Sequence, residues 1–258
     1  MIEKEAKTIG LETSSLMPLI EITPRTLPLQ INLSDALKKG YKFITDRYSV
    51  IEAQDQIKTS YENAKNSLIK AKEISERDSI KGCKHCEVVF VKALAENWYG
   101  REETLRWSDC LLNINENTDD FWGSLENSLD EKRGVYFQTL KDDADEILIE
   151  SSRIMSYWVR PAHGRELSMK IKIVNNKYSL QDFFSELQPI INTVYREKVT
   201  INDVIDFYHL FSLYHDAGVA EVWSCNQNFV KRHEKYLENL NSNKFSEVFK
   251  NVRIRRIK

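Results

Sequence analysis

Residues 34–78 have the sequence SDALKKGYKFITDRYSVIEAQDQIKTSYENAKNSLIKAKEISERD. Ser34 is of a type that caps helix N-termini, and apolar side chains then recur every three or four positions, with one slip near residues 54–56. The recurring positions are Leu37, Tyr41, Ile44, Tyr48, Ile51, Ile57, Tyr61, Ala64, Leu68 and Ala71. This spacing predicts a helical region at 34–80, formed by one long helix or a helical hairpin, and it favours packing in a bundle over an intermolecular coiled coil.

Three prolines precede this region and predict an extended segment. Pro18, Pro24 and Pro28 are too close together for a helix, because proline lacks the backbone N–H and restricts the residue before it. Residues 1–33 are therefore predicted to form an extended N-terminal arm that lies on another surface.

The rest of the chain, residues 81–258, predicts a helical domain with a minor β element. Apolar periodicity indicates helices at 135–159, 179–187, 201–217 and 226–240. Ser179 with Asp182 forms a capping box for the second of these helices. The segment SMKIKIV alternates apolar and polar side chains, so residues 169–174 are the clearest strand.

The composition supports the same fold class. With only 8 Gly and 5 Pro in 258 residues, the chain has few tight turns. A hydrophobic content of 41% with 29% charged residues is typical of a folded globular protein. We therefore predict a mainly α protein, a multi-helix bundle with a minor β element and the extended arm.

The sequence also indicates where the protein acts. The longest apolar runs are as short as Val88–Val91, too short to cross a membrane. The N-terminus MIEKEAKTIG lacks the apolar centre of a signal peptide. The four cysteines are spaced irregularly, unlike the disulfide framework of a secreted protein. We expect a cytoplasmic protein that does not bind membranes.

The charge is distributed unevenly along the chain. Residues 116–150 hold eleven acids against three bases, which leaves −8, whereas residues 231–258 hold nine bases against three acids, which leaves +6. Bases neutralise phosphates in nucleic-acid binding that depends on salt and little on sequence. The predicted nucleic-acid-binding residues are Lys250, Arg253, Arg255, Arg256 and Lys258. Their alternation with Val252, Ile254 and Ile257 is also typical of a C-terminal strand with one apolar face.

The segment FYHLFSLYHDAG, residues 207–218, raises the question of a metal site. Its LFSLYHDAG part resembles the His-Asp signature of HD-type metal phosphohydrolases, but no Asp follows Asp216, where that family has a further ligand. On a helical wheel His215 falls among apolar residues, whereas His209 and Asp216 share another side, so the two histidines do not converge on one ion. The alternative catalytic set is His163, His209, His215 and Asp216. Otherwise His215 is a buried histidine and Asp216 faces solvent.

The cysteines form one short motif. Cys83 and Cys86 are the chain's only CxxC, and such a turn presents two thiolates to a tetrahedral ion. Cys110 and Cys225 would complete a structural zinc site if the fold brought them together. In the alternatives, Cys110 and Cys225 are small core residues and CKHC is a loop, or CKHC is a redox pair of the thioredoxin kind, which would need a strand-to-helix context.

Binding is the function that these features favour. The arm, the long helix and the basic tail are docking features, and the sequence contains no P-loop, GxGxxG, GxSxG or HExxH motif. We expect a non-catalytic helical scaffold or accessory subunit of a larger assembly that handles nucleic acid, with protein partners. The alternative is a metal-dependent nuclease or phosphohydrolase with a site around His209, His215 and Asp216.

Overall fold

The computed structural model describes residues 7–20, 27–97, 101–115, 117–150, 168–195, 201–239, 245 and 250–257. The chain forms two compact units. The sheet unit consists of Met1–Ala53 and Lys141–Lys258, and the helical unit is the inserted segment Gln54–Leu140. Helices predominate over strands in the described residues, so the protein is mainly α with a minor β part.

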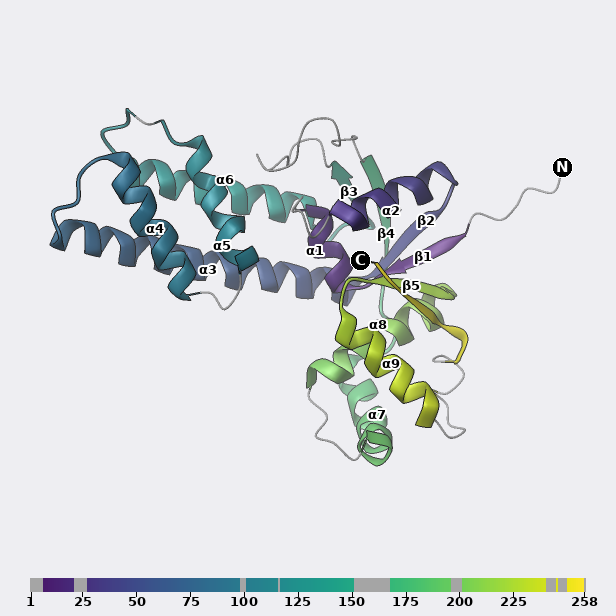
Figure 1. The fold of residues 1–258 in the computed structure, drawn as a ribbon. Helices are drawn as coiled ribbons and strands as arrows, with labels where there is room; N and C mark the ends of the chain where they lie inside the picture. Colours follow the sequence, from purple (N-terminus) through teal and green to yellow (C-terminus); the bar gives the residue numbers. More distant parts are fainter. Residues whose placement is uncertain are drawn as a thin grey trace. The chain divides into compact units, whose positions relative to one another are not determined.

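Within the described residues, a six-stranded sheet forms the centre of the sheet unit (Figure 1). Its spatial order is β3-β4-β2-β1-β5-β6. β3 pairs antiparallel with β4, and the other neighbours pair parallel. The strands are β1 (Thr8–Leu11), β2 (Lys42–Asp46), β3 (Glu146–Glu150), β4 (Ser168–Val174), β5 (Glu221–Ser224) and β6 (Arg253–Arg256).

Helices cover both faces of this sheet. α1 (Thr13–Ile20) and α2 (Leu27–Lys38) connect β1 to β2, α7 (Leu180–Tyr195) and α8 (Ile201–Ala217) connect β4 to β5, and α9 (Gln227–Asn239) precedes β6. The first two connections run in opposite directions along the sheet, and right-handed crossovers then place their helices on opposite faces. Figure 1 shows α1 and α2 on one side of the strands and α7, α8 and α9 on the other.

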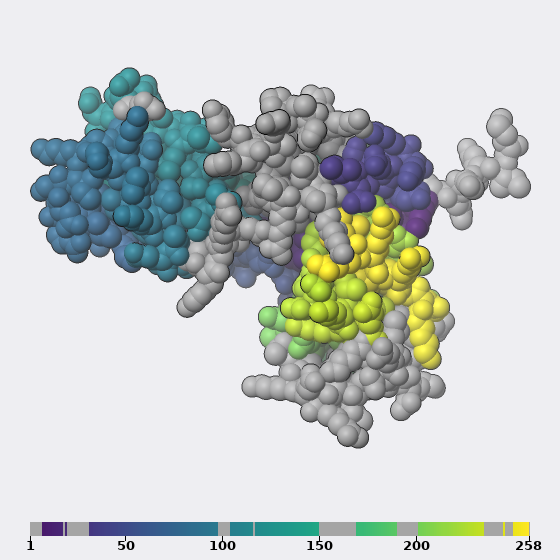
Figure 2. All heavy atoms as spheres, viewed as in Figure 1, coloured from purple at the N-terminus to yellow at the C-terminus, as the bar shows by residue number. Residues whose placement is uncertain are grey.

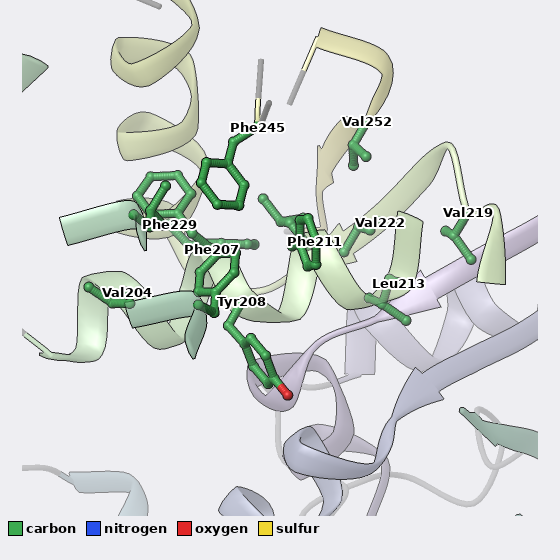
Figure 3. Close-up of a cluster of buried hydrophobic side chains, with 13 residues drawn as sticks. Val204, Phe207, Tyr208, Phe211, Leu213, Val219, Val222, Phe229, Phe245 and Val252 are labelled. Atoms are coloured by element: carbon green, nitrogen blue, oxygen red, sulfur yellow. The ribbon is translucent and has the colours of Figure 1, made fainter. Parts of the chain in front are cut away.

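The main core of the sheet unit lies between α7, α8, α9 and the last two strands (Figure 3). The ring of Phe183 on α7 lies 5.1 Å from that of Phe211 on α8, and Phe229 of α9 is buried in the same cluster. Burying one such side chain contributes about 1.5–3 kcal/mol. The cluster contains Phe183, Leu187, Val204, Phe207, Tyr208, Leu210, Phe211, Leu213, Val219, Val222, Phe229, Phe245 and Val252. α8 contributes more of these residues than any other element and is the central helix of the unit.

Gly10 of β1 allows this core to approach the sheet closely. A Cβ atom at Gly10 would lie 3.0 Å from the side chains of Leu213 and Val222 and 3.1 Å from that of Val219. Contacts this short do not fit a close-packed interior, so any larger residue would displace core side chains.

The helical unit has its own core. Its elements are the part of α3 (Arg47–Arg77) beyond Ala53, α4 (Cys83–Asn97), α5 (Arg101–Ser108), the 3-10 turn η1 (Asp109–Asn113) and α6 (Phe121–Thr139). Trp107 of α5 is fully buried, and its indole N–H donates to the hydroxyl of Ser60 on α3 at 2.7 Å. Its ring also contacts Tyr136 of α6 edge-on, so one side chain joins three helices.

The first and last residues of the helical unit are in contact. The side-chain amide of Gln54 donates a hydrogen bond to the backbone carbonyl of Leu140. The inserted segment therefore leaves and rejoins the rest of the chain at one point.

The helical region predicted at 34–80 is wrong in its first part. α3 is helical from Arg47 to Arg77, but β2 occupies Lys42–Asp46 before it. Phe43 and Thr45 of β2 are buried, and the aromatic and β-branched residues of this segment favour a strand. Gly40, with φ of +76°, separates α2 from the strand.

The extended N-terminal arm is not confirmed. β1, α1 and α2 occupy the described part of residues 1–33. Pro28 is the second residue of α2, where a helix needs no backbone N–H from it. Pro24 lies outside the described residues.

The helix predicted at 135–159 is also wrong. α6 ends at Thr139, and the following apolar residues form β3. Ile147 and Ile149 are each 1% exposed and Leu148 between them is 51% exposed, so the period is two, not 3.6. Residues 151–159 lie outside the described part of the chain.

Four predicted elements are confirmed: the strand at 169–174 as β4, and the helices at 179–187, 201–217 and 226–240 as α7, α8 and α9. In the part of the chain that the structure describes, no helix has both the length and the apolar character that a membrane crossing requires.

We predict that Gly10→Val lowers the free energy of unfolding by about 1–3 kcal/mol, because the new side chain overpacks the contact between α8 and the sheet. Urea unfolding followed by circular dichroism measures the change. Gly134→Ala is the control, since a Cβ there meets nothing within 4 Å and Ala favours the helix. Equal stability of Gly10→Val and the wild type would contradict the close approach.

Candidate functional site

The carboxyl ends of β1, β2 and β5 meet at one edge of the sheet. The strand order reverses at β1, because the chain leaves it toward β2 and returns later on its other side as β5. Open parallel sheets bind ligands outside the carboxyl ends of their strands at such a switch point. Glu12 directly follows β1, Asp46 ends β2 and Ser224 ends β5. This edge is therefore the first place to look for a site.

His209 of α8 is buried at this edge between two carboxylates. Its Nδ1 lies 3.0 Å from Oδ2 of Asp46 and 2.9 Å from Oγ of Ser49. Its Nε2 lies 3.0 Å from Oε2 of Glu52, in the first turns of α3. A doubly protonated imidazole donates to both carboxylates, and these charge-assisted hydrogen bonds join β2, α3 and α8.

The charges of this triad stabilise one another. Burial alone would lower the pKa of His209, but Asp46 and Glu52 raise it to about 10. Burial alone would raise the pKa of each carboxyl group, but His209 holds both below their usual values. The histidine is thus a fixed cation at neutral pH and is not available as a general base.

Glu12 is a further buried carboxylate at the end of β1, with 5% of the residue exposed. It accepts hydrogen bonds from the backbone N–H of Ser14 at 2.7 Å and from the hydroxyls of Ser14 and Ser15. The Ser14 hydroxyl also accepts from the N–H of Cys225 at 3.2 Å, which ties Glu12 to the end of β5. Burial raises the pKa of Glu12, and the bonds from Ser14 offset part of that effect.

Asp206 lies one helical turn before His209 on α8. Arg232 of α9 pairs with it at 3.2 Å and also with Asp203 at 2.5 Å. Burial, and then the negative charge of Glu12, raise the pKa of Asp206 to about 7, although the charge of His209 acts in the opposite direction. The negative charges of Glu12 and Glu52 therefore both act against ionisation of Asp206.

We call Glu12, Asp46, Glu52, Asp206 and His209 the edge cluster. When all of its groups are ionised and Arg232 is counted with its two partners, Asp206 and Asp203, five carboxylates face two cations, which leaves three negative charges in excess. Such an excess in a partly buried place attracts a cation or a ligand rich in hydrogen-bond donors.

A chain of hydrogen bonds extends from the edge cluster along α8. The amide of Asn176 donates to Oδ1 of Asp46 at 3.1 Å and to the hydroxyl of Ser212 at 2.8 Å. That hydroxyl donates to Oδ2 of Asp216 at 3.2 Å, and Oδ1 of Asp216 lies 2.9 Å from Nδ1 of His215. His209 and Asp216 are thus linked through side chains, although they are two turns apart.

The helical wheel assigned the two histidines to the wrong environments. His209 is the buried one, whereas 54% of the His215 side chain is exposed and its ring stacks on Phe211. Asp216, predicted to face solvent, has a side chain only 1% exposed. α8 is buried on most sides. Which of its polar side chains are buried therefore depends on polar partners in neighbouring segments and not on the apolar pattern of the helix. His163 lies outside the described residues.

The predicted zinc ligands are divided between the two units. Cys83, Cys86 and Cys110 belong to the helical unit and Cys225 to the sheet unit. Cys110 is buried, and its Sγ lies 3.7 Å from the carbonyl oxygen of Ser128. CKHC is not a loop, since Cys83 is the first residue of α4. The zinc site stays a prediction.

The basic C-terminal residues lie on the surface of the sheet unit. Their segment is the yellow part of Figure 2, and its exposed members include Arg253, Arg255 and Arg256 of β6 together with Lys250. The guanidinium of Arg255 lies 5.1 Å from the centre of the Trp223 ring. The alternative that this segment is a strand is confirmed, and nucleic-acid binding stays a prediction. Lys258 lies outside the described residues.

Four site residues were missed from the sequence, namely Glu12, Asp46, Glu52 and Asp206. Two of them left a signal, because TIGLE and KFITD each end a short apolar run in a carboxylate. That pattern marks the carboxyl end of a buried parallel strand. Glu52 and Asp206 left none, since acids on helices are usually solvated.

No model of a known protein family matches the chain, and no curated protein or solved structure matches it either. Among the side chains that the structure describes, no three or more of His, Cys, Asp and Glu are placed to hold a metal ion as they stand.

We predict that His209→Gln destabilises the protein by about 3–5 kcal/mol near pH 7, because it leaves the buried Asp46 and the half-buried Glu52 uncompensated. The wild type should lose stability as pH rises from 6.5, the ordinary histidine pKa, through about 10, where the folded protein releases the proton. The variant should lack that dependence. Urea unfolding between pH 6 and pH 10 measures both.

His215→Gln is the matched control, since its ring is exposed, and its curve should follow the wild type. A His209→Gln curve that also follows the wild type would show that the imidazole is not charged in the folded protein.

Proposed function

We propose that the sheet unit is a metal-dependent nuclease and that the edge cluster is its catalytic site. The observation that carries this proposal is the gathering of Glu12, Glu52 and Asp206 at the switch point of a parallel sheet, with negative charge in excess. Carboxylate oxygens are the ligands that Mg²⁺ and Mn²⁺ prefer. This was the second candidate from the sequence, with a different set of acids.

The acids of the edge cluster have different roles in this proposal. Asp46 is committed to His209, Ser49 and Asn176, so it positions the cluster. Glu12, Glu52 and Asp206 would hold the cation, after Glu12 and Glu52 exchange their present serine and threonine donors for it. A divalent ion there would activate a water molecule and offset the charge of a phosphodiester.

Asp206 is the acid of the edge cluster at which a proton competes most with a cation. Its pKa is raised to about 7, so cation binding there should weaken as the pH falls below neutral. The same burial and repulsion cost stability whenever Asp206 is ionised, as is common for groups in active sites.

The basic strand supports a polymeric substrate. β6 pairs with β5 in parallel, with Trp223 beside Arg255 and Ser224 beside Arg256. The exposed arginines therefore lie toward the same carboxyl edge as the edge cluster, where they would bind phosphates next to the one that is cleaved.

We predict opposite effects of Asp206→Asn on activity and stability. Cleavage of labelled RNA and DNA oligonucleotides with Mn²⁺ should fall by about 100-fold or more, and Glu12→Gln should behave alike. The stability that Asp206 contributes should be lost as pH rises from about 4 through 7, because the folded state prefers the protonated acid. Asp206→Asn should therefore be more stable than the wild type at pH 8, seen as a higher Tm, and similar at pH 4.

Asp35→Asn, an exposed acid on α2, is the control and should cleave normally. A wild type that is inactive on every oligonucleotide with Mg²⁺ and with Mn²⁺ would overturn the nuclease, whatever the stability of the variants.

A second candidate is the non-catalytic function favoured by the sequence. It is supported by the exposed arginines of β6 and by a histidine fixed as a cation. In this form the protein is a cytoplasmic accessory subunit that binds nucleic acid through β6. Protein partners dock on the helices of the helical unit, and zinc bound at the cysteines has a structural role.

For this second candidate, we predict that replacing Arg253, Arg255 and Arg256 with Ala weakens binding to all single strands alike. The dependence of log K on log salt should become less steep by about 0.7 for each phosphate that the variant no longer neutralises. Fluorescence anisotropy at several salt concentrations measures both. Replacing Lys58, Lys72 and Lys92 with Ala removes as much charge from the helical unit and should change little. Equal effects of both variants would contradict a specific role for β6.

A further inference from the structure

The CKHC motif forms the first turn of α4. Cys83 is the first residue of that helix and Cys86 follows three residues later. The carbonyl of Gly82 accepts hydrogen bonds from the N–H groups of His85 and Cys86 at 3.1 and 3.2 Å, so Gly82 caps the helix. Residues three apart on a helix face the same side. The two thiols are therefore neighbours on one turn.

The two cysteines differ in exposure. Cys83 is half-buried, and its Sγ lies 3.9 Å from the carbonyl oxygen of Thr118. Cys86 is buried, with 6% of the residue exposed. An accessible sulfur next to a buried one is the arrangement in which one thiol reacts first and the other resolves.

We propose that Cys83 and Cys86 form a reversible disulfide by exchange with an external disulfide of the glutathione type. This function is independent of the edge cluster and lies in the other unit. Cys110 is buried, so it does not compete as a nucleophile.

The geometry of the first turn permits the bond. Cβ atoms three residues apart on a helix are about 5–6 Å from each other, whereas a disulfide requires about 3.5–4.5 Å. The first N–H groups of a helix have no partner within it, so the first turn tightens without breaking the rest of the ladder. Gly82, with φ of +91°, gives the chain freedom just before it.

The exchange proceeds in two steps. The Cys83 thiolate attacks oxidised glutathione, which forms a mixed disulfide and releases one glutathione thiolate. The Cys86 thiol then loses its proton and attacks the sulfur of Cys83, which releases the second glutathione. Two protein thiols are oxidised to one disulfide, and one glutathione disulfide is reduced to two thiols.

The test uses the full chain with Cys110→Ser and Cys225→Ser, which leaves only the CKHC pair. The protein is equilibrated in buffers of defined ratio of reduced to oxidised glutathione, treated with iodoacetamide and weighed by mass spectrometry. We expect loss of two hydrogens and no alkylation at oxidising ratios, with full reversal at reducing ratios. Adding Cys86→Ser should trap one glutathione on Cys83, whereas adding Cys83→Ser should leave Cys86 mostly unmodified.

Circular dichroism checks that each variant is folded, and peptide mapping of the oxidised wild type gives the same answer if the variants are not. Alkylation of both cysteines at every ratio would overturn the proposal. So would equal glutathione adducts on both single-cysteine forms. Protection from iodoacetamide that a chelator removes would overturn it in favour of a metal site.

Discussion

The imidazolium of His209, held between Asp46 and Glu52, joins the end of a central strand to two helices at the carboxyl edge of the sheet. Taking these charges out of water is costly, and the three groups remain ionised only because each compensates its neighbours. Once His209 is fixed, the turn of α8 before it places Asp206 at the same edge, and Asn176 continues the hydrogen bonds toward Asp216. These buried polar groups of the sheet unit are therefore connected through one cation, His209.

Around that cation, the acids are not balanced. His209 holds the pKa values of Asp46 and Glu52 down, while burial raises those of Glu12 and Asp206. Asp46 thus has a structural role, whereas Glu12 and Asp206 carry negative charge that a positive partner would offset. A fold that needed only stability would have placed an amide or an apolar side chain at Asp206.

The sequence predicted those elements whose periodicity was unbroken, such as β4 and α9, because Met169, Ile171 and Ile173 alternate inward as their spacing requires. It failed where a short strand lay inside a longer apolar pattern. KFIT of β2 and EILI of β3 each fit a helical period over a few residues, and only pairing with distant strands decides against it. The site could be predicted even less well. The sequence drew attention to His209, but its partners come from β2 and α3, which are far from it in the chain. Burial on nearly all sides of α8 removes the contrast on which a helical wheel depends.

The hydrogen bond between Gln54 and Leu140 closes the inserted segment at the point where it leaves the sheet unit. Because the inserted segment is closed at its base, it acts as a short connection between β2 and the strands that follow it. The loop-closure entropy for pairing β2 with β4 is therefore smaller than the number of residues between them suggests. Lineages could lengthen, shorten or exchange the helices beyond that closure while the register of the sheet and the spacing of its acids stayed the same. The molecule thus combines a part constrained by charge geometry with a part open to change.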